Sequence, residues 1–74
     1  MSTLDQLCPG QRCIVCRINC QGPIRRRLLD MGLTNGVEIE VIRTAPMGDP
    51  VEYRLRGYHL SLRKSEASQV QVLE

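Results

Sequence analysis

Residues 37–56 read VEIEVIRTAPMGDPVEYRLR and contain two stretches in which apolar and charged residues alternate. Alternation with period two is typical of a β-strand that buries one of its faces. In the first stretch we expect Val37, Ile39 and Val41 to face the core. The loop between the stretches contains two prolines and a glycine. The sequence therefore predicts an antiparallel hairpin, with strands at 37–41 and 51–56.

The charged residues of this hairpin should lie on its solvent face. There, Glu38 and Glu40 can oppose Arg54 and Arg56 across the two strands. A well-placed pair of this kind contributes roughly 0.2–1 kcal/mol. These pairs favour one register more than they add to stability.

Further strands are expected on both sides of the hairpin. Residues 12–18 are rich in β-branched and small apolar residues and are followed by turn residues at 19–23. Residues 58–62 alternate again, residues 63–68 can form one helical turn, and residues 70–72 can form a last short strand.

One short amphipathic helix is expected after the first strand. Pro23 suits the first helical turn because its missing N–H would have no partner there. Ile24, Leu28 and Met31 recur at helical spacing, and Gly32 provides a C-terminal stop. We expect the three apolar side chains to point inward.

These elements predict one mainly β domain, residues 1–74, that forms a small, partly open barrel of about five strands. A chain this short buries only about 60% of the surface of its unfolded form. The sequence has no Phe or Trp and two Tyr, so the core should be aliphatic. Tyr53 and Tyr58 are expected in the core, with their hydroxyls at its rim.

Charge and composition exclude several classes of function. A formal charge of +2 is too small for a dedicated nucleic-acid binder. The sequence contains no run of about 18 apolar residues, the length needed to span a membrane. Its start, MSTLDQLCPGQ, lacks the features of a secretion signal. We therefore expect a cytoplasmic protein. With no paired carboxylates, no nucleophile beside a base and a single histidine, His59, we do not expect an enzyme. His59 should face outward.

Four cysteines form a candidate metal site with the spacing C-x4-C-x2-C-x3-C: Cys8, Cys13, Cys16 and Cys20. Four thiolates could hold zinc, iron or an iron cluster. However, Cys13 and Cys16 are three residues apart in one expected strand and should point to opposite faces. In the alternative interpretation Cys16 is a small core residue and the other three are partly exposed thiols.

Two segments are candidates for partner binding. Arg25, Arg26 and Arg27 form a basic helix face that can dock on an acidic surface, or can simply be solvated. The loop 45–50, with Met47, Gly48 and Asp49 at its tip, is stiffened by proline and could present a preformed contact. Alternatively, it is an ordinary hairpin loop.

Three stretches, in this order, resemble the FeoA family: RRLLDMGLTNGVEIEV, APMGDP and RGYHLSLRKSEA. The resemblance runs from about Pro23 to the C-terminus. It implies an SH3-like barrel in the cytoplasm. It also implies an accessory role in bacterial ferrous-iron uptake beside FeoB, a membrane permease with a GTP-binding domain, and no chemistry of the chain's own.

Two hypotheses of function follow. In the first, the chain is an interaction module that binds the cytosolic part of FeoB and regulates or supports iron transport, which rests on the resemblance. In the second, it is a metal-binding or redox-sensing protein that uses the four cysteines. The sequence leaves open whether the protein activates or inhibits and whether it forms a homo-oligomer.

Overall fold

A computed structural model describes residues 2–73 of the chain. Its elements, in chain order, are β1 (Ser2–Thr3), the 3-10 helix η1 (Leu4–Gln6), β2 (Arg12–Ile18), α1 (Pro23–Asp30), β3 (Glu38–Thr44), β4 (Val51–Leu55), β5 (Tyr58–Leu62), α2 (Lys64–Ala67) and β6 (Val70–Leu73).

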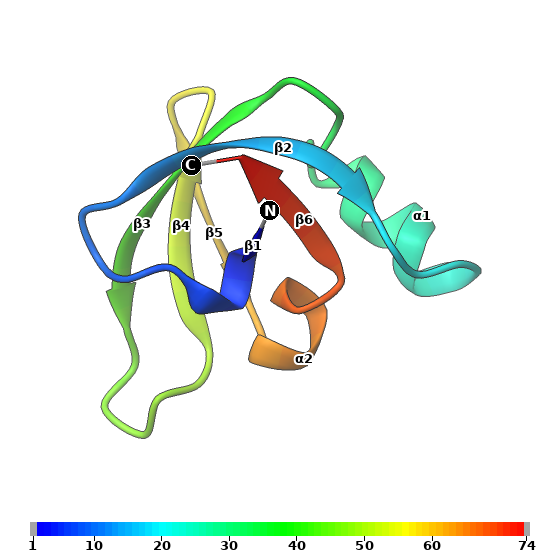
Figure 1. The fold of residues 1–74 in the computed structure, drawn as a ribbon. Helices are drawn as coiled ribbons and strands as arrows, with labels where there is room; N and C mark the ends of the chain where they lie inside the picture. Colours follow the sequence, from blue (N-terminus) through cyan, green and yellow to red (C-terminus); the bar gives the residue numbers. More distant parts are fainter. Residues whose placement is uncertain (1, 74) are drawn as a thin grey trace.

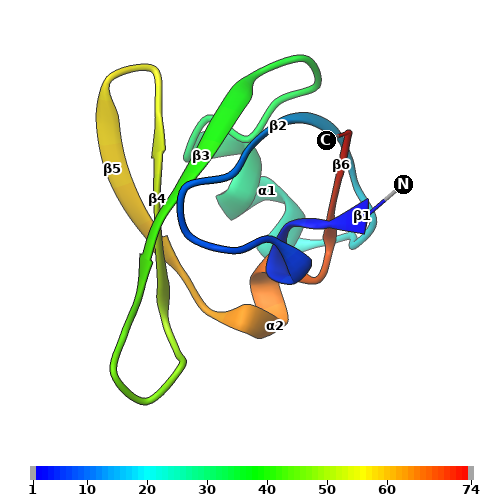
Figure 2. The same ribbon diagram turned by 60° about the vertical axis from the view of Figure 1, so that its left-hand side comes forward.

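The strands form one antiparallel sheet in the order β1-β6-β2-β3-β4-β5. The sheet curves around a single core and leaves β1 and β5 at its two edges (Figures 1 and 2). α1 follows β2 on one side of the sheet, and α2 connects β5 to β6. The prediction of a mainly β, partly open barrel is confirmed, with the two-residue β1 as an additional strand.

The predicted hairpin is formed by β3 and β4, and one of its two expected ion pairs is present. Glu40 lies opposite Arg54, and Arg54 Nη2 is 2.6 Å from Glu40 Oε1. The second pair does not form. Glu38 lies opposite Ile14 of β2, and Arg56 lies in the β4–β5 turn with φ of 50°.

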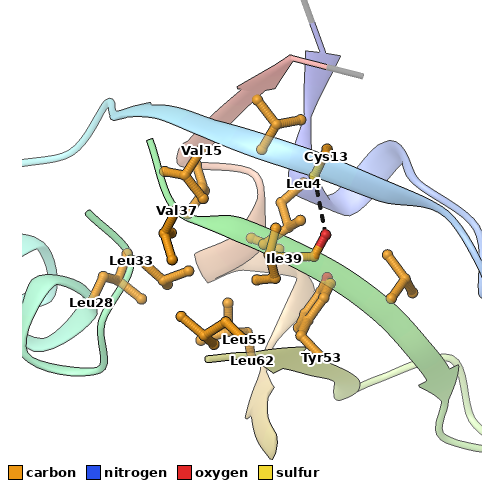
Figure 3. Packing of buried hydrophobic residues seen from close by; sticks show 14 of the residues in the cluster. Leu4, Cys13, Val15, Leu28, Leu33, Val37, Ile39, Tyr53, Leu55 and Leu62 are labelled. Atoms are coloured by element: carbon orange, nitrogen blue, oxygen red, sulfur yellow. Dashed lines mark hydrogen bonds between the residues drawn. The ribbon is translucent and has the colours of Figure 1, made fainter. Parts of the chain in front are cut away.

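The core is aliphatic apart from Tyr53 and Cys13, as the composition predicted (Figure 3). The three residues of β3 expected inside, Val37, Ile39 and Val41, are all buried. Leu4 of η1 is also completely buried, a contribution that sequence analysis did not identify, because a single apolar residue in a polar lead shows no periodicity. It packs against the sheet and so ties the N-terminal segment to the core.

Two residues expected inside lie outside. Ile24 is 50% exposed, because α1 is anchored to the core through Leu28 and through Leu33 beyond its end, both fully buried, and not through its first turn. Tyr58, at the start of the edge strand β5, is 44% exposed. Its ring lies outside the core, near the end of α1, where its hydroxyl donates to the carbonyl of Met31.

The alternative interpretation placed Cys16 in the core and Cys13 among the partly exposed thiols. The structure shows the opposite for these two residues. Cys13 is buried, and its thiol lies 3.9 Å from the carbonyl oxygen of Ile39 (Figure 3). Cys16 is only partly buried. Cys13 and Val15 are two apart in β2 and both face inward, whereas the register against β6 shifts between Val15 and Arg17. Cys16 therefore occupies an irregularity in the strand and is not a core residue.

Candidate partner-binding face

The first candidate segment, α1, is tied to α2 by an ion pair. Arg27 Nη1 lies 2.6 Å from Glu66 Oε2, and the Glu66 side chain is only 11% exposed. The other oxygen of Glu66 accepts the backbone N–H of Arg63 at 3.0 Å. Arg27 is thus occupied in holding two helices together, although its side chain remains 61% exposed.

The end of α1 is fixed to the β4–β5 hairpin. The hydroxyl of Tyr58 donates to the carbonyl of Met31, the residue that follows the helix. Gly32 comes next, with φ of 100°, and a Cβ there would lie 2.6 Å from the Tyr58 hydroxyl oxygen. The close approach of the tyrosine and the positive φ both require glycine at this position.

The three arginines of α1 therefore have different roles. Arg27 pairs with Glu66, whereas Arg25 and Arg26 form no ion pair with any carboxylate among residues 2–73. A shallow hollow lies along α1. Its lining includes all three arginines, Leu29 and Asp30. This part of the helix presents positive charge next to apolar surface.

The second candidate segment, the loop 45–50, is also held in place. The N–H of Ala45 donates to the carbonyl of Pro50 at 3.0 Å, and the N–H of Gly48 donates to the carbonyl of Ala45 at 2.7 Å. Asp49 Oδ1 accepts the backbone N–H of Lys64 at 2.8 Å, at the start of α2. The Met47 side chain, in contrast, is 92% exposed.

The short helix α2 connects these two segments. Glu66 of α2 forms the ion pair with Arg27 of α1. The backbone N–H of Lys64 donates to Asp49 of the loop. Both views of the fold place α2 beside the end of the barrel from which the loop extends (Figures 1 and 2). We call α1, α2 and the loop 45–50 together the helical face.

The role of α2 in this face was not predicted from the sequence. The signal was present: Glu66 stands three residues after Arg63, at the position where a glutamate reaches back to the backbone N–H that precedes a helix. Two more basic side chains, Arg63 just before α2 and Lys64 at its start, are exposed here, and Arg63 Nη1 lies 4.0 Å from Asp49 Oδ2. The helical face therefore carries two more basic side chains than α1 alone, and Glu66 and Asp49 offset their charge.

The structure keeps the four cysteines apart. Cys8 is exposed in the segment before β2, Cys13 is buried, and Cys16 and Cys20 are partly buried. No group of three or more His, Cys, Asp or Glu side chains in residues 2–73 is arranged to hold a metal ion. Metal binding by these thiols stays a prediction, and in this conformation they do not form one site.

The single histidine belongs to a charged cluster on the outer face of the sheet. His59 Nδ1 lies 3.0 Å from Glu52 Oε2, and Arg43 Nε lies 2.7 Å from Glu52 Oε1. His59 lies on the edge strand and its side chain is 54% exposed, as alternation predicted. These contacts join neighbouring strands and favour their register.

No helix within residues 2–73 has the length and apolar character needed to cross a lipid bilayer.

Comparison with known proteins gives a match over nearly the whole sequence. The family model of the FeoA domain matches residues 2–74. The chain belongs to the FeoA family. A curated relative, the Fe(2+) transport protein A/Fe(2+) transporter FeoB fusion protein of Porphyromonas gingivalis, is 38% identical over 69 residues. That match covers 93% of this chain, whereas the chain spans only 8% of the length of the relative.

Solved structures of FeoA proteins have the same fold. The FeoA-like protein of Clostridium acetobutylicum is 42% identical, with a TM-score of 0.88, over 99% of this chain and 84% of that one. The zinc complex of FeoA from Stenotrophomonas maltophilia is 28% identical, with a TM-score of 0.85, over 97% of this chain and 89% of that one. The latter is described as a prokaryotic SH3 domain protein. The SH3-like barrel implied by the resemblance is therefore confirmed.

Proposed function

We propose that this FeoA protein is a cytoplasmic accessory protein of ferrous-iron uptake. In this proposal it binds the cytosolic, GTP-binding part of the permease FeoB and regulates or supports transport. It acts as a binding module without chemistry of its own.

The observation that carries the proposal is that a relative of this chain is fused to FeoB in a single protein. In the Porphyromonas gingivalis relative, the matched 69 residues belong to a protein named as a fusion of transport protein A and transporter FeoB. Fusion keeps two partners at a high effective concentration, which is useful when separate chains would have to associate. A separate chain of the same family would have to find the permease by binding.

The helical face supports the proposal because it combines features of a binding surface. Arg25 and Arg26 are not neutralised by ion pairs among the described residues, and Met47 is exposed on a loop held by hydrogen bonds. Arginine and methionine are both enriched at protein interfaces. A loop and a helix that are already fixed lose little conformational entropy on binding.

Binding alone would not regulate transport. The module changes the activity of the permease only if it prefers one conformational or nucleotide state of it. The test therefore measures the binding of the reduced protein to the isolated GTP-binding domain and to the detergent-solubilised permease, each with and without a GTP analogue.

The proposal expects saturable binding to at least one of these proteins, with an affinity that depends on the nucleotide. If the affinity is equal in all nucleotide states, the protein would only be tethered to the permease and would not regulate it. Absence of binding to both proteins in every state would refute the proposal.

A further inference from the structure

A second hollow adjoins the first one along α1 and shares Arg25 and Leu29 with it. It lies between the end of β2 and α1, and is lined by Cys16, Arg17, Ile18, Arg25, Leu29, Leu33 and Asn35. Its volume is about 390 Å³, near the lower end of the range of roughly 300–1,000 Å³ for ligand pockets. It suits a few side chains of a peptide and not a large cofactor.

The hollow has two positive charges and no negative one. Arg17 comes from β2 and Arg25 from α1, and no carboxylate contributes to the lining. Arg17 Nε donates to Asn19 Oδ1 at 3.0 Å, which holds the guanidinium at the end of the strand. Neither arginine forms an ion pair within residues 2–73. A carboxylate between the two would relieve their repulsion and could form bidentate hydrogen bonds.

The rest of the lining includes the apolar side chains of Ile18 and Leu29 and the polar Asn35. Leu33 is fully buried, and Leu29 is 37% exposed. Arg25 and Leu29 are four residues apart in α1 and so share one side of the helix. A ligand that fits this hollow therefore needs a negative charge next to an apolar group.

We propose that this hollow binds an acidic peptide segment, in which a carboxylate side chain contacts Arg17 and Arg25 while a neighbouring apolar side chain packs on Leu29. The proposal rests on the proposed function, because it assigns this segment to the cytosolic part of the permease. An acidic peptide supplies both kinds of group, whereas a free phosphate ion supplies only the charge.

The test is an amide NMR titration of the full-length, reduced protein with a short blocked peptide of alternating glutamate and leucine. Inorganic phosphate and a matched peptide with glutamine in place of glutamate serve as comparisons. The proposal predicts that chemical-shift changes concentrate at residues lining the hollow. It also predicts that the glutamine peptide and phosphate bind much more weakly.

Variants separate a specific site from general charge attraction. Replacing Arg17→Gln and Arg25→Gln together should weaken binding of the glutamate peptide about tenfold, as expected for the loss of charged hydrogen bonds. The matched control replaces Arg12→Gln and Arg56→Gln, which line a hollow that also contains Glu38 and Glu40. The control removes the same charge and should leave the affinity nearly unchanged. The dispersion of the amide signals verifies that each variant is folded.

Equal weakening in both double variants would overturn the proposal, because only net charge would then matter. Equal affinity for the glutamine peptide or for phosphate would also overturn it. Measuring the same variants against the permease keeps the two proposals apart. If the unmodified protein binds the permease and the Arg17/Arg25 variant binds as well, this inference fails and the proposed function stands. If the unmodified protein does not bind the permease, the proposed function fails, and so does the assignment of the segment to it.

Discussion

Arg27 of α1 and Glu66 of α2 form an ion pair, with 2.6 Å between Nη1 and Oε2, that joins these two α-helices. Glu66 is a buried charged residue, 9% exposed. It also accepts the backbone N–H of Arg63, just before α2. One carboxylate therefore both caps α2 and fixes it to α1.

The two partners of this pair should contribute unequally to stability. Glu66→Ala removes the ion pair and leaves the Arg63 N–H without its acceptor, which should cost roughly 1–3 kcal/mol. Arg27→Ala should cost less than about 1 kcal/mol, because an exposed partner gains little from pairing. Urea unfolding of both variants gives the comparison. Equal losses would contradict the assignment of a second role to Glu66.

The contact between Gly32 and Tyr58 predicts a difference between two glycines. Gly32 and Gly36 have similar positive φ values, 100° and 91°, but a Cβ at Gly36 would meet nothing within 4 Å. Gly36→Ala should therefore cost only the backbone strain, roughly 1–2 kcal/mol. Gly32→Ala adds the clash with Tyr58 and should cost about 1–3 kcal/mol more. Thermal or urea unfolding measures both, and equal costs would show that Tyr58 moves away freely.

The hydrogen bond from the Lys64 N–H to Asp49 predicts that the loop 45–50 stabilises α2. Asp49→Ala should lower the free energy of unfolding by about 1 kcal/mol, the usual value of an N-terminal cap. Hydrogen exchange of the Lys64 amide should become faster, and Asp49→Asn should restore most of the protection. Met47→Ala serves as the control and should change stability by less than about 0.5 kcal/mol. Unchanged exchange at Lys64 in Asp49→Ala would contradict this account.

The buried Tyr53 side chain should make the protein less stable at alkaline pH. Burial, with smaller effects of Asp5, Cys13 and Asp49, raises the pKa of Tyr53 above the usual value, which is about 10. The unfolded chain therefore releases this proton first. The stabilising effect is complete below about pH 10 and is lost as the pH rises further, by about 1.4 kcal/mol per pH unit.

Tyr53→Phe tests this dependence because it removes the titrating group. Urea unfolding between about pH 9 and pH 11 should show a shallower loss of stability in the variant. Parallel pH profiles would show that Tyr53 does not contribute.

The sequence predicted those parts of the fold that depend on regular periodicity. The alternation in 37–41 and 51–56 predicted the positions of β3 and β4 and their buried residues, but β3 continues to Thr44, past a shift in its register with β4 between Val41 and Arg43. It failed where regularity ends: Cys16 lies where the register of β2 shifts, and Arg56 lies in a turn instead of a strand. Neither feature changes the composition of the segment, so a pattern of residue types does not reveal it.

The candidate binding face was predictable only in part. Arg26 and Met47 are exposed, and their contact with a partner stays a prediction. The roles of Arg27 and Asp49 in holding α2 depend on contacts across 39 and 15 residues of sequence. Such contacts are set by the way the chain folds back on itself. The sequence thus marked the residues, and the structure shows that Arg27 and Asp49 among them also hold α2 in place.

The central claim, that the helical face binds the permease FeoB, is tested most directly by measuring binding of three proteins to the detergent-solubilised permease. They are the unmodified chain, a variant with Arg26→Glu and Met47→Ala, and the control Arg56→Glu, which lies in the β4–β5 turn outside the face. The account predicts saturable binding of the unmodified chain and the control, and binding of the face variant that is weaker by about tenfold or more. Equal binding of all three would place the contact elsewhere, and no saturable binding of the unmodified chain in any nucleotide state would contradict the claim.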